Sequence, residues 1–379
     1  MKKQTGIIIL SIILVALVVA LVIGLTGSET GRTVKEKQIK IGASLPLSGK
    51  IAYMGQHMQE GIDLAVSEIN AKGGINGKPI KIVYDDTQGT TKGGLDSYNK
   101  LSQIDNIKIF LSATTNAVMA AAPLAEENKQ ILFAIATAST TISKAGDFIF
   151  RNTLLAQQEI KFLANSLNNM GYKKIGLLII GNSGGESYRQ ALKKEFETLG
   201  GEIALTEKFE EQSNDFRTQL LKLDKSDATA IICVAHTQET GLILRQAKEL
   251  GINKQIVGMF ATEGPSLIEA AGEAADGVLY THFFDPDKQT QLNKQYNQKY
   301  LLAYGRESEP YAALAYDNVI ILAHALKNCD PDDTICIKTE LYKIQNMETV
   351  TGKTSFDSNG DTTKEIILKT VRNGKFVLY

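Results

Sequence analysis

KIGLLII (residues 174–180) and AIICVA (residues 230–235) are two short runs made almost entirely of apolar residues. Strands in the middle of a parallel sheet have this composition, because helices cover both faces and leave no side in contact with water. A helical pattern follows each run, at residues 188–199 and 239–250. This alternation predicts an α/β fold in which parallel-type sheets are covered by helices.

The same alternation fills the part of the chain before these runs. Residues 39–46 predict a strand, and residues 55–70 predict a helix, on which Met58, Ile62 and Ala65 recur on one face. The other expected elements are strands at 79–84, 107–111 and 131–135 and helices at 94–104 and 117–128. Single domains usually contain about 100–200 residues, so two such blocks in 379 residues predict two lobes.

The first 37 residues differ from the rest. Lys2 and Lys3 precede an apolar run at residues 7–25, and a polar tether at residues 26–37 follows. Nineteen helical residues span about 28 Å, close to the hydrocarbon thickness of a bilayer. The lysines favour a cytoplasmic N-terminus and export of everything after the run. We favour an anchor at the extracytoplasmic face of the cell membrane; a cleaved signal, leaving a periplasmic or secreted protein, is the alternative.

The charge balance bears on the expected partners, and the cysteines bear on the expected cellular compartment. The chain has 41 Lys and Arg against 42 Asp and Glu, so nothing in its charge indicates nucleic acid as a partner. Cys329 and Cys336 lie close together in the polar stretch NCDPDDTIC, and a disulfide between them suits an oxidising compartment. A metal pair is the alternative, but partner ligands are lacking nearby. Cys233, in an apolar run, is expected to be a buried free thiol.

The loops that follow the predicted strands are rich in Ser, Thr and Gly. Examples are LSATTNAVM (111–119), AIATASTTIS (134–143) and AHTQETG (235–241). In open α/β sheets ligands bind beyond the carboxyl ends of the strands, so two lobes predict one site in the cleft between them. Free N–H groups at helix N-termini would line this cleft. Helix capping also explains many of these Ser and Thr residues, and one loop can serve both purposes.

Two short motifs resemble catalytic or metal sites. GNSGG (181–185) matches the G-x-S-x-G nucleophile elbow, between a predicted strand and a predicted helix. A triad also needs a later acid and a histidine, and we interpret Ser183 as part of a tight turn that opens a helix. DSNGD (357–361) resembles the start of a calcium loop, but Leu368 stands where that motif requires Glu, so a turn between two strands is favoured. We expect no catalytic residue, no metal and no cofactor.

Seven segments, in order along the chain, carry a family resemblance. They are IKIGASLPLSG (39–49), GIDLAVSEINAKGGINGKPIKIVYDD (61–86), APLAEENKQ (122–130), DFRTQLLKL (215–223), ILRQAKELGI (243–252), PYAALAYDNVIILAHAL (310–326) and TGKTSFDSNGD (351–361). With them the chain resembles the Leu/Ile/Val-binding proteins, the type I periplasmic receptors of ABC importers for branched-chain amino acids and related solutes. The resemblance covers nearly everything from residue 39 to residue 379.

The resemblance implies two Rossmann-like lobes joined by three hinge crossovers, with the ligand trapped by closure. The crossovers are expected near residues 152–155, 281–285 and 350–352. Residues 38–153 plus 284–350 would then form the first lobe. Residues 154–283 plus 351–379 would form the second lobe.

In the first lobe, the resemblance places ligand contacts in two loops. Thr115 would hold a ligand carboxylate together with N–H groups at a helix start. Ala136 matches a backbone contact. The family threonine falls on Ala138, for which Thr137 or Ser139 could substitute.

Further implied contacts come from both lobes. Tyr53 and Met54 would lie over the ligand. Tyr188 matches an aromatic contact of the family, and His236 and Thr237 match a contact loop of the second lobe.

One departure concerns the acid that pairs with a ligand ammonium group. An ungapped match puts Phe260 at its position, and Glu263 could serve only if the loop is rearranged. A buried ammonium without an acidic partner would cost several kcal/mol, on the order of the penalty for any unpaired buried charge. An α-amino acid and a carboxylate without the amine are therefore both open as ligands.

The resemblance implies a receptor that captures a small amino acid or related carboxylate in the cleft and delivers it to an ABC permease. A ligand-sensing ectodomain of the same fold is the alternative. Such a sensor is expected to continue into a membrane-spanning and a signalling segment, and neither follows the lobes in this sequence. An exported hydrolase that uses Ser183 is disfavoured.

Overall fold

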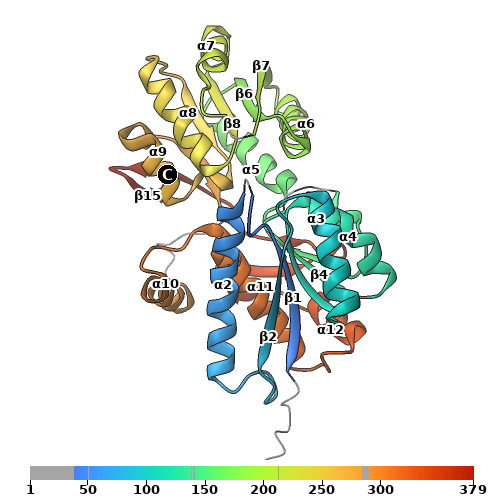
Figure 1. Cartoon of the computed structure of the whole chain (residues 1–379). Helices are drawn as coiled ribbons and strands as arrows, with labels where there is room; N and C mark the ends of the chain where they lie inside the picture. The colour runs from blue at the N-terminus through green and yellow to red at the C-terminus, as the bar shows by residue number, and fades with distance from the viewer. Residues whose placement is uncertain (1–37, 50, 138, 140, 212, 284–289) are drawn as a thin grey trace, which may run out of the picture. The chain divides into compact units, whose positions relative to one another are not determined.

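Two open sheets of mainly parallel strands carry the fold, and helices cover both (Figure 1). The computed structural model describes residues 38–49, 51–137, 139, 141–211, 213–283 and 290–379. The predicted anchor at residues 7–25 lies outside them, and none of the helices within them is long and apolar enough to cross a membrane. The predicted α/β fold is confirmed.

The first sheet has the strand order β2-β1-β3-β4-β5, and all its neighbouring strands are parallel. Its strands are β1 (Ile39–Leu45), β2 (Ile80–Asp86), β3 (Ile109–Ala113), β4 (Ile131–Ile135) and β5 (Ile149–Asn152). Successive side chains of a strand point to opposite faces. Ile109 and Leu111 therefore pack into one core cluster, and Phe110 between them packs into another. With both faces buried, β3 is apolar along most of its length.

Helices cover both faces of this sheet. They are α2 (Ala52–Ala71), α3 (Thr91–Asn99), α4 (Thr115–Glu127), α10 (Gln291–Tyr304), α11 (Pro310–Leu326) and α12 (Thr334–Tyr342), with short helical turns at η1 (Lys100–Ile104) and η2 (Ile142–Lys144). Helices α2, α11 and α12 contact one face, and α3 and α4 contact the other (Figure 1). Helices α2 and α11 pack closely because Gly61 has no side chain: a Cβ there would lie 2.0 Å from the carbonyl oxygen of Ala312.

The second sheet has the order β15-β14-β10-β9-β8-β6-β7. Its strands are β6 (Lys174–Ile180), β7 (Glu202–Phe209), β8 (Ala230–Val234), β9 (Gln255–Gly258), β10 (Leu279–His282), β14 (Ile367–Arg372) and β15 (Lys375–Leu378). Strands β6 to β10 are parallel, and β14 and β15 join antiparallel at one edge. The run KIGLLII is β6, with the bounds expected from its composition.

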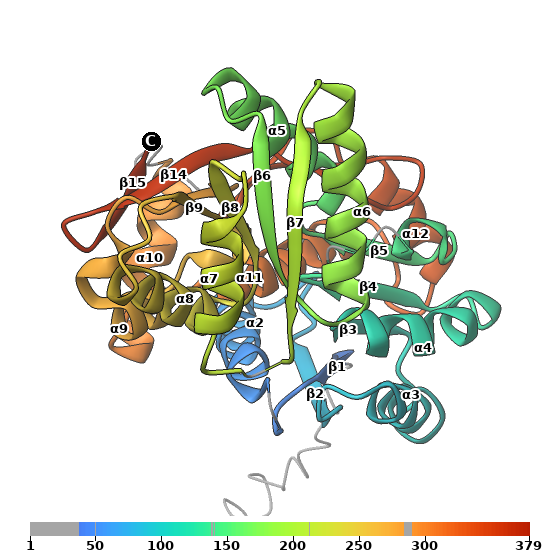
Figure 2. The same cartoon turned by 90° about the horizontal axis from the view of Figure 1, so that it is seen from above.

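Helices also cover both faces of the second sheet (Figure 2). They are α5 (Ala156–Asn169), α6 (Ser183–Thr198), α7 (Arg217–Lys225), α8 (Thr237–Glu249) and α9 (Pro265–Ala271), with turns at η3 (Phe260–Thr262) and η4 (Gly272–Ala275). Leu177 and Ile179 of β6 pack with residues of α5 and α6, whereas Leu178 and Ile180 pack with residues of α7 and α8. The strand is thus buried on both sides, as its sequence predicts.

The last strands form a separate three-stranded sheet, of order β11-β12-β13, and the antiparallel edge of the second sheet. β12 (Gly352–Phe356) pairs with β11 (Met347–Thr349) and β13 (Thr362–Thr363), and the ring of Phe356 lies 5.8 Å from the ring of Phe133 in the first core cluster. The sequence-based division assigned all of residues 351–379 to the second lobe. Only β14 and β15 join the second sheet, because Phe356 holds the preceding hairpin on the first. We propose that the third crossover lies at residues 364–366.

The other crossovers follow from the element bounds. β5 ends at Asn152 and α5 begins at Ala156, so we propose residues 153–155 as the first crossover. β10 ends at His282 and α10 begins at Gln291, and residues 284–289 between them lie outside the described part of the chain.

Two of the cysteines are bonded. Cys329 and Cys336, the pair expected from the sequence, form a disulfide between α11 and α12, with Cα atoms 5.8 Å apart. Cys233 in β8 is a buried free thiol, and burial raises its pKa to about 12. A thiol in this state is inert at neutral pH.

Candidate functional site

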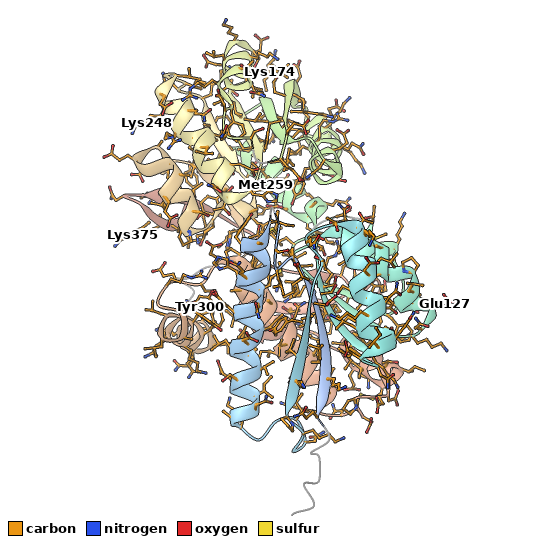
Figure 3. All side chains as sticks on the ribbon, viewed as in Figure 1. Glu127, Lys174, Lys248, Met259, Tyr300 and Lys375 are labelled. Carbon is orange, nitrogen blue, oxygen red and sulfur yellow. A yellow bond between two sulfur atoms is a disulfide. The ribbon has the colours of Figure 1, made fainter. Side chains whose placement is uncertain are left out.

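Both sheets have a switch point where the direction of winding reverses. β1 lies between β2 and β3, and β6 lies between β7 and β8. Ligands of open α/β sheets bind in the crevice at the carboxyl ends of such strands. In Figure 3, Met259 follows β9 and lies near the N-terminal end of α2, whereas Lys174 lies at the far end of the second sheet. The carboxyl ends of the second sheet therefore face the first lobe.

At the start of α4, the capping residue is Thr114. Its Oγ1 accepts a hydrogen bond from Ala117 N at 3.4 Å, and its φ is 69°. A β-branched residue rarely adopts a positive φ. Thr115 is the first helical residue and is half-buried, beside N–H groups that have no partner within the helix. Thr114 takes the capping role that might otherwise explain Thr115.

The loop after β4 is strained and contains a buried hydroxyl. Ala136 has a φ of 50°, a left-handed conformation that costs energy for a residue with a Cβ. Thr137 is 1% exposed, and its Oγ1 has no hydrogen-bond partner among the described residues. Ser139 Oγ lies 2.9 Å from Thr141 Oγ1. Ala138 lies outside the described residues.

Tyr53 and Met54 have different environments. Met54 is 7% exposed and packs in the core of the first lobe. Tyr53 is half-buried, with its ring centroid 6.3 Å from that of Tyr311 in an edge-on arrangement. Burial raises the pKa of Tyr53 well above its usual range, and Tyr311, Glu239 and Glu309 raise it further. Since Glu239 belongs to α8, Tyr53 lies where the two lobes meet.

His236 and Thr237 lie at the start of α8. His236 N donates to Glu239 Oε2 at 3.0 Å. Thr237 is 1% exposed, and its Oγ1 donates to the carbonyl oxygen of Ala261 at 2.7 Å. The Thr237 hydroxyl therefore ties α8 to the turn after β9.

Tyr188 is 8% exposed and is held by a residue that the sequence analysis did not single out. Its hydroxyl donates to Glu159 Oε2 at 2.8 Å. Phe260 N donates to Glu159 Oε1 at 2.7 Å, and the Thr281 hydroxyl donates to the same oxygen. Burial raises the pKa of Glu159, and these hydrogen bonds oppose the rise. Glu159 thus joins α5 to α6, η3 and β10.

Phe260 and Glu263 both have close partners within the protein. Phe260 is 6% exposed and packs with core residues of the first lobe, and its ring lies 6.0 Å from that of Phe283. Glu263 forms an ion pair with the fully buried Lys369 at 2.6 Å and accepts from the Tyr280 hydroxyl at 2.7 Å. Burial alone would raise the pKa of Glu263, but its cationic neighbours and these hydrogen bonds hold it below the usual value. Its charge is already compensated within the lobe.

The lobes approach each other closely at Gly264. A Cβ on Gly264 would lie 3.1 Å from Thr237 Cγ2 and 3.3 Å from Glu309 Oε1. Glu309 precedes α11 in the first lobe. The absence of a side chain at residue 264 therefore allows this approach.

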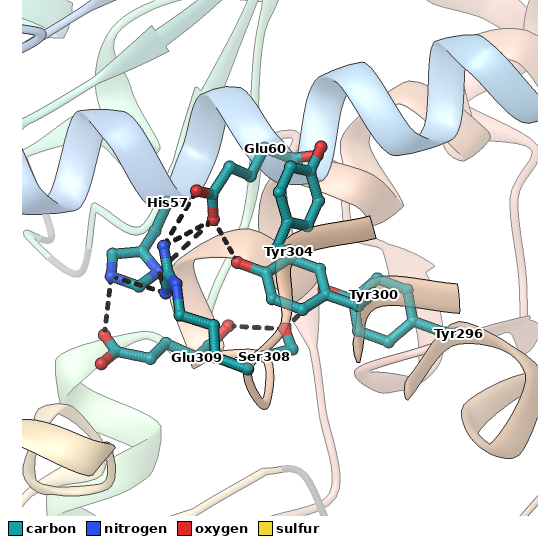
Figure 4. Close-up of polar contacts among 8 residues, drawn as sticks. His57, Glu60, Tyr296, Tyr300, Tyr304, Ser308 and Glu309 are labelled. Atoms are coloured by element: carbon teal, nitrogen blue, oxygen red, sulfur yellow. Dashed lines mark hydrogen bonds and ion pairs between the residues drawn. The ribbon is translucent and has the colours of Figure 1, made fainter. Parts of the chain in front are cut away.

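Glu309 belongs to a polar cluster that also contains His57, Glu60 and Arg306 (Figure 4). Arg306 Nη2 donates to Glu60 Oε1 at 2.8 Å, and Arg306 Nη1 lies 2.9 Å from His57 Nδ1. His57 Nε2 lies 3.7 Å from Glu309 Oε2. Burial, and then Arg306, lower the pKa of His57 to about 4, and burial raises that of Glu309 to about 7.

Comparison with known proteins identifies the family and supports the fold. A family model described as periplasmic binding protein matches residues 38–375. The chain belongs to the periplasmic binding protein family. This binding protein is 27% identical over 326 residues to Leu/Ile/Val-binding protein homolog 2 of Brucella abortus (strain 2308), covering 85% of this chain and 87% of the relative.

Two solved structures place the binding protein within the Leu/Ile/Val-binding group. A leucine-binding protein, LivK, from Thermotoga maritima is 26% identical with a TM-score of 0.82, covering 90% of this chain and 97% of the other. LivJ from Streptococcus pneumoniae, solved with isoleucine, is 30% identical with a TM-score of 0.81, covering 90% and 99%. The predicted family and its type I fold are confirmed, and the protein is a solute receptor of the kind that serves ABC transporters.

The two motifs that resemble catalytic or metal sites lie in turns between elements of the fold. Ser183 begins α6, so GNSGG forms the strand-to-helix turn. DSNGD lies between β12 and β13. Within the described part of the chain, no group of three or more His, Cys, Asp or Glu could hold a metal ion. The relatives are named as binding proteins.

Three residues of the binding protein escaped the sequence analysis. Tyr311 was noted only as part of the family segment at residues 310–326, although the Pro310 before it marks a helix start. Glu239 and Glu159 carry a weak signal, a glutamate in the first turn of a helix. Helix α6 likewise has Glu186 in its first turn, whereas α2, α3 and α4 have no acidic residue there.

Proposed function

We propose that this receptor captures a small carboxylate-bearing solute between its lobes and delivers it to an ABC importer. The solute is an amino acid or a closely related acid. Relatives named for leucine, isoleucine and valine, and a relative solved with isoleucine, support this class. The first lobe would bind the carboxylate.

The observation that carries the proposal is the edge formed by the ends of β3 and β4. These strands are neighbours, with Ala113 opposite Ile135. Their ends place Thr115, at the start of α4, beside the loop that holds the buried Thr137 hydroxyl. Helix N-termini bind anions through free N–H groups and the helix dipole, and hydroxyl donors add to this. A carboxylate is the group that this combination binds best.

The group at the other end of the solute is less constrained. Glu263 is occupied by Lys369, and Glu159 accepts three hydrogen bonds inside the second lobe. Glu239 and Glu309 are the acids that lie near Tyr53 and Tyr311, where the lobes meet. An ammonium group would have to rely on these acids or on backbone carbonyls. We therefore expect the carboxylate of the solute to contribute more to binding than the amine.

A thermal-shift series on the purified full-length protein tests the proposal. A bound ligand stabilises the folded state by about 2.7 kcal/mol at a concentration 100 times its Kd. L-leucine, L-isoleucine and 4-methylpentanoate (leucine without its amine) are the probes, and leucinamide, which lacks the carboxylate, is the control. At least one acid should raise Tm, and leucinamide should not. Equal shifts with leucine and leucinamide, or no shift with any acid, would contradict the proposal.

Residues 7–25 would hold the receptor at the extracytoplasmic face of the membrane, or would be removed on export. Intact-mass measurement of the mature protein separates these two cases. A chain that retains residues 1–37 is anchored, and a chain that begins near residue 28 has lost a signal peptide.

A further inference from the structure

Arg151 lies directly behind the loop that follows β4. It belongs to β5, next to β4, and its side chain is fully buried. Its Nη1 donates to the carbonyl oxygens of Thr137 and Ser139, at 3.1 and 2.5 Å, and its Nη2 donates to Ser143 Oγ at 2.7 Å. One guanidinium therefore holds three points of a single loop. We call its described residues (136, 137, 139 and 141–143) the β4 loop.

The other side of the guanidinium is held by Asp361. Arg151 Nε donates to Asp361 Oδ1 at 2.7 Å, and Arg151 Nη2 lies 2.6 Å from the same oxygen. Asp361 is 2% exposed and lies between β12 and β13, and Arg151 N donates to the carbonyl oxygen of neighbouring Gly360 at 2.9 Å. The planar fork of arginine can bond in two directions at once, which a lysine cannot reproduce. Asp361 thus fixes the orientation of the group that holds the β4 loop.

The β4 loop needs such a restraint. Ala136 has a left-handed backbone, and strained backbone persists only where the surroundings determine it. The Thr137 hydroxyl is buried without a partner among the described residues, although Arg151 holds the carbonyl of the same residue. A donor kept unpaired in a strained loop is ready for a ligand and costs no rearrangement when the ligand arrives.

We propose that Arg151 is a positioning residue for solute binding, acting through the β4 loop. It holds the Thr137 hydroxyl in its binding geometry before the solute enters. Asp361, from the hairpin before the third crossover, keeps Arg151 in place. The inference rests on the proposed function, because it assigns Arg151 to the carboxylate end of that site.

The first test measures the affinity of the full-length protein for L-leucine and for 4-methylpentanoate by calorimetry. Arg151→Lys should weaken binding of the acid that the wild type binds by at least about tenfold, the loss expected for one hydrogen bond to a charged group. In a Thr137→Val background, the same substitution should cost less than about threefold, since the hydroxyl that it positions is gone. Leu220→Ala, in the core of the second lobe, is the control that lowers Tm without changing affinity. Equal losses in both backgrounds would overturn the proposal.

The second test needs no ligand, so it separates this inference from the proposed function. Amide hydrogen exchange in the β4 loop should be faster in Arg151→Lys than in the wild type, with β6 and β8 unchanged. Asp361→Asn, which keeps the arginine, should show the same change to a smaller extent and serves if the lysine variant does not fold. Unchanged exchange in the β4 loop of the folded variants would overturn the positioning role, even if the wild type binds leucine. If no acid binds, the proposed function fails and the exchange result still decides the inference.

Discussion

The first-lobe and second-lobe edges of the candidate site are prepared in different ways. In the first lobe, Thr114 and Ala136 have positive φ, and the buried Thr137 hydroxyl has no partner among the described residues. In the second lobe, Tyr188 is hydrogen-bonded to Glu159, and Glu263 is paired with a buried lysine. Among the described residues from β6 to β10, only glycines have a positive φ.

The difference indicates that the two lobes have different roles in binding the solute. Strain and unpaired donors cost stability, and proteins keep them mainly where they serve function. The first lobe has both at the ends of β3 and β4, which supports the proposal that it binds the carboxylate. In the second lobe, Tyr188 and Glu263 are bonded internally, whereas the Thr262 hydroxyl, turned toward Gly258, has no hydrogen-bond partner among the described residues. We infer that the second lobe is a stable domain that covers the solute.

The largest expected effect concerns the stability of the second lobe. Glu159→Ala leaves three buried donors without an acceptor, so we expect the free energy of unfolding to fall by about 3–5 kcal/mol. Glu159→Gln keeps an oxygen for Phe260 N and Thr281, and should lose less than about 1.5 kcal/mol. Urea denaturation monitored by circular dichroism gives both values. A loss below about 1 kcal/mol for the alanine variant would show that the second lobe does not depend on this junction.

Glu263 separates stability from binding. Glu263→Gln leaves the charge of the fully buried Lys369 without its anion, so we expect a loss of about 2–3 kcal/mol in unfolding free energy. The affinity for L-leucine should change by less than threefold, because Glu263 already has its cation. Calorimetry and urea denaturation on the same preparation test both statements. A large loss of affinity for leucine, with none for 4-methylpentanoate, would assign Glu263 to the ligand amine after all.

In the first lobe, we expect a substitution to weaken binding without lowering stability. Thr115→Ala should weaken binding of the carboxylate probe by at least about tenfold, because a hydrogen bond to a charged group contributes ~1.5–3 kcal/mol. Its effect on Tm should be small, since Thr114 caps the helix. Thr198→Ala, near the exposed end of α6, is a matched control for the same substitution in a helix. Unaltered affinity of the Thr115 variant would remove this residue from the site.

The smallest effect concerns pH. The folded pKa of His57 is about 4 and its ordinary value is 6.5, so the unfolded chain binds more protons between these values. The contribution of His57 to stability should therefore fall as the pH drops from about 6.5 to 4, and His57→Gln should remove about 1–2 kcal/mol of pH dependence, allowing for partial solvent screening. Glu309, whose folded pKa is raised to about 7, contributes in the opposite direction. Glu309 titrates in both proteins, so the difference between their stability profiles isolates His57. Parallel profiles would contradict the prediction.

Much of the fold could be predicted from local sequence. KIGLLII has the bounds of β6 because a strand buried on both faces must be apolar along its length. We propose a later third crossover than the one expected from the sequence, because the position of the hairpin depends on where Phe356 packs, in contact with residues distant in the chain. Pattern alone could not reveal this long-range contact.

The candidate site was harder to predict than the fold. The residue types of Tyr188 and Glu263 suit ligand contacts, but their polar atoms are bonded to Glu159 and Lys369, which lie far away in sequence. Spacing identifies which residues follow a strand, and it does not show where their side chains point. Gly264, at which the two lobes approach each other, has no local signature that distinguishes it from other glycines in loops.

The first-turn glutamates have a kinetic consequence. Helices α5, α6 and α8 of the second lobe neutralise the positive ends of their own dipoles with Glu159, Glu186 and Glu239. Helices α2 and α4 of the first lobe have no acidic residue in the first turn, so the positive ends of their dipoles are available to bind an anion from outside. We therefore expect that a carboxylate solute binds first to the first lobe of the open protein, and that the second lobe then closes over the solute. The encounter step should slow as ionic strength rises, whereas closure should be nearly insensitive to salt.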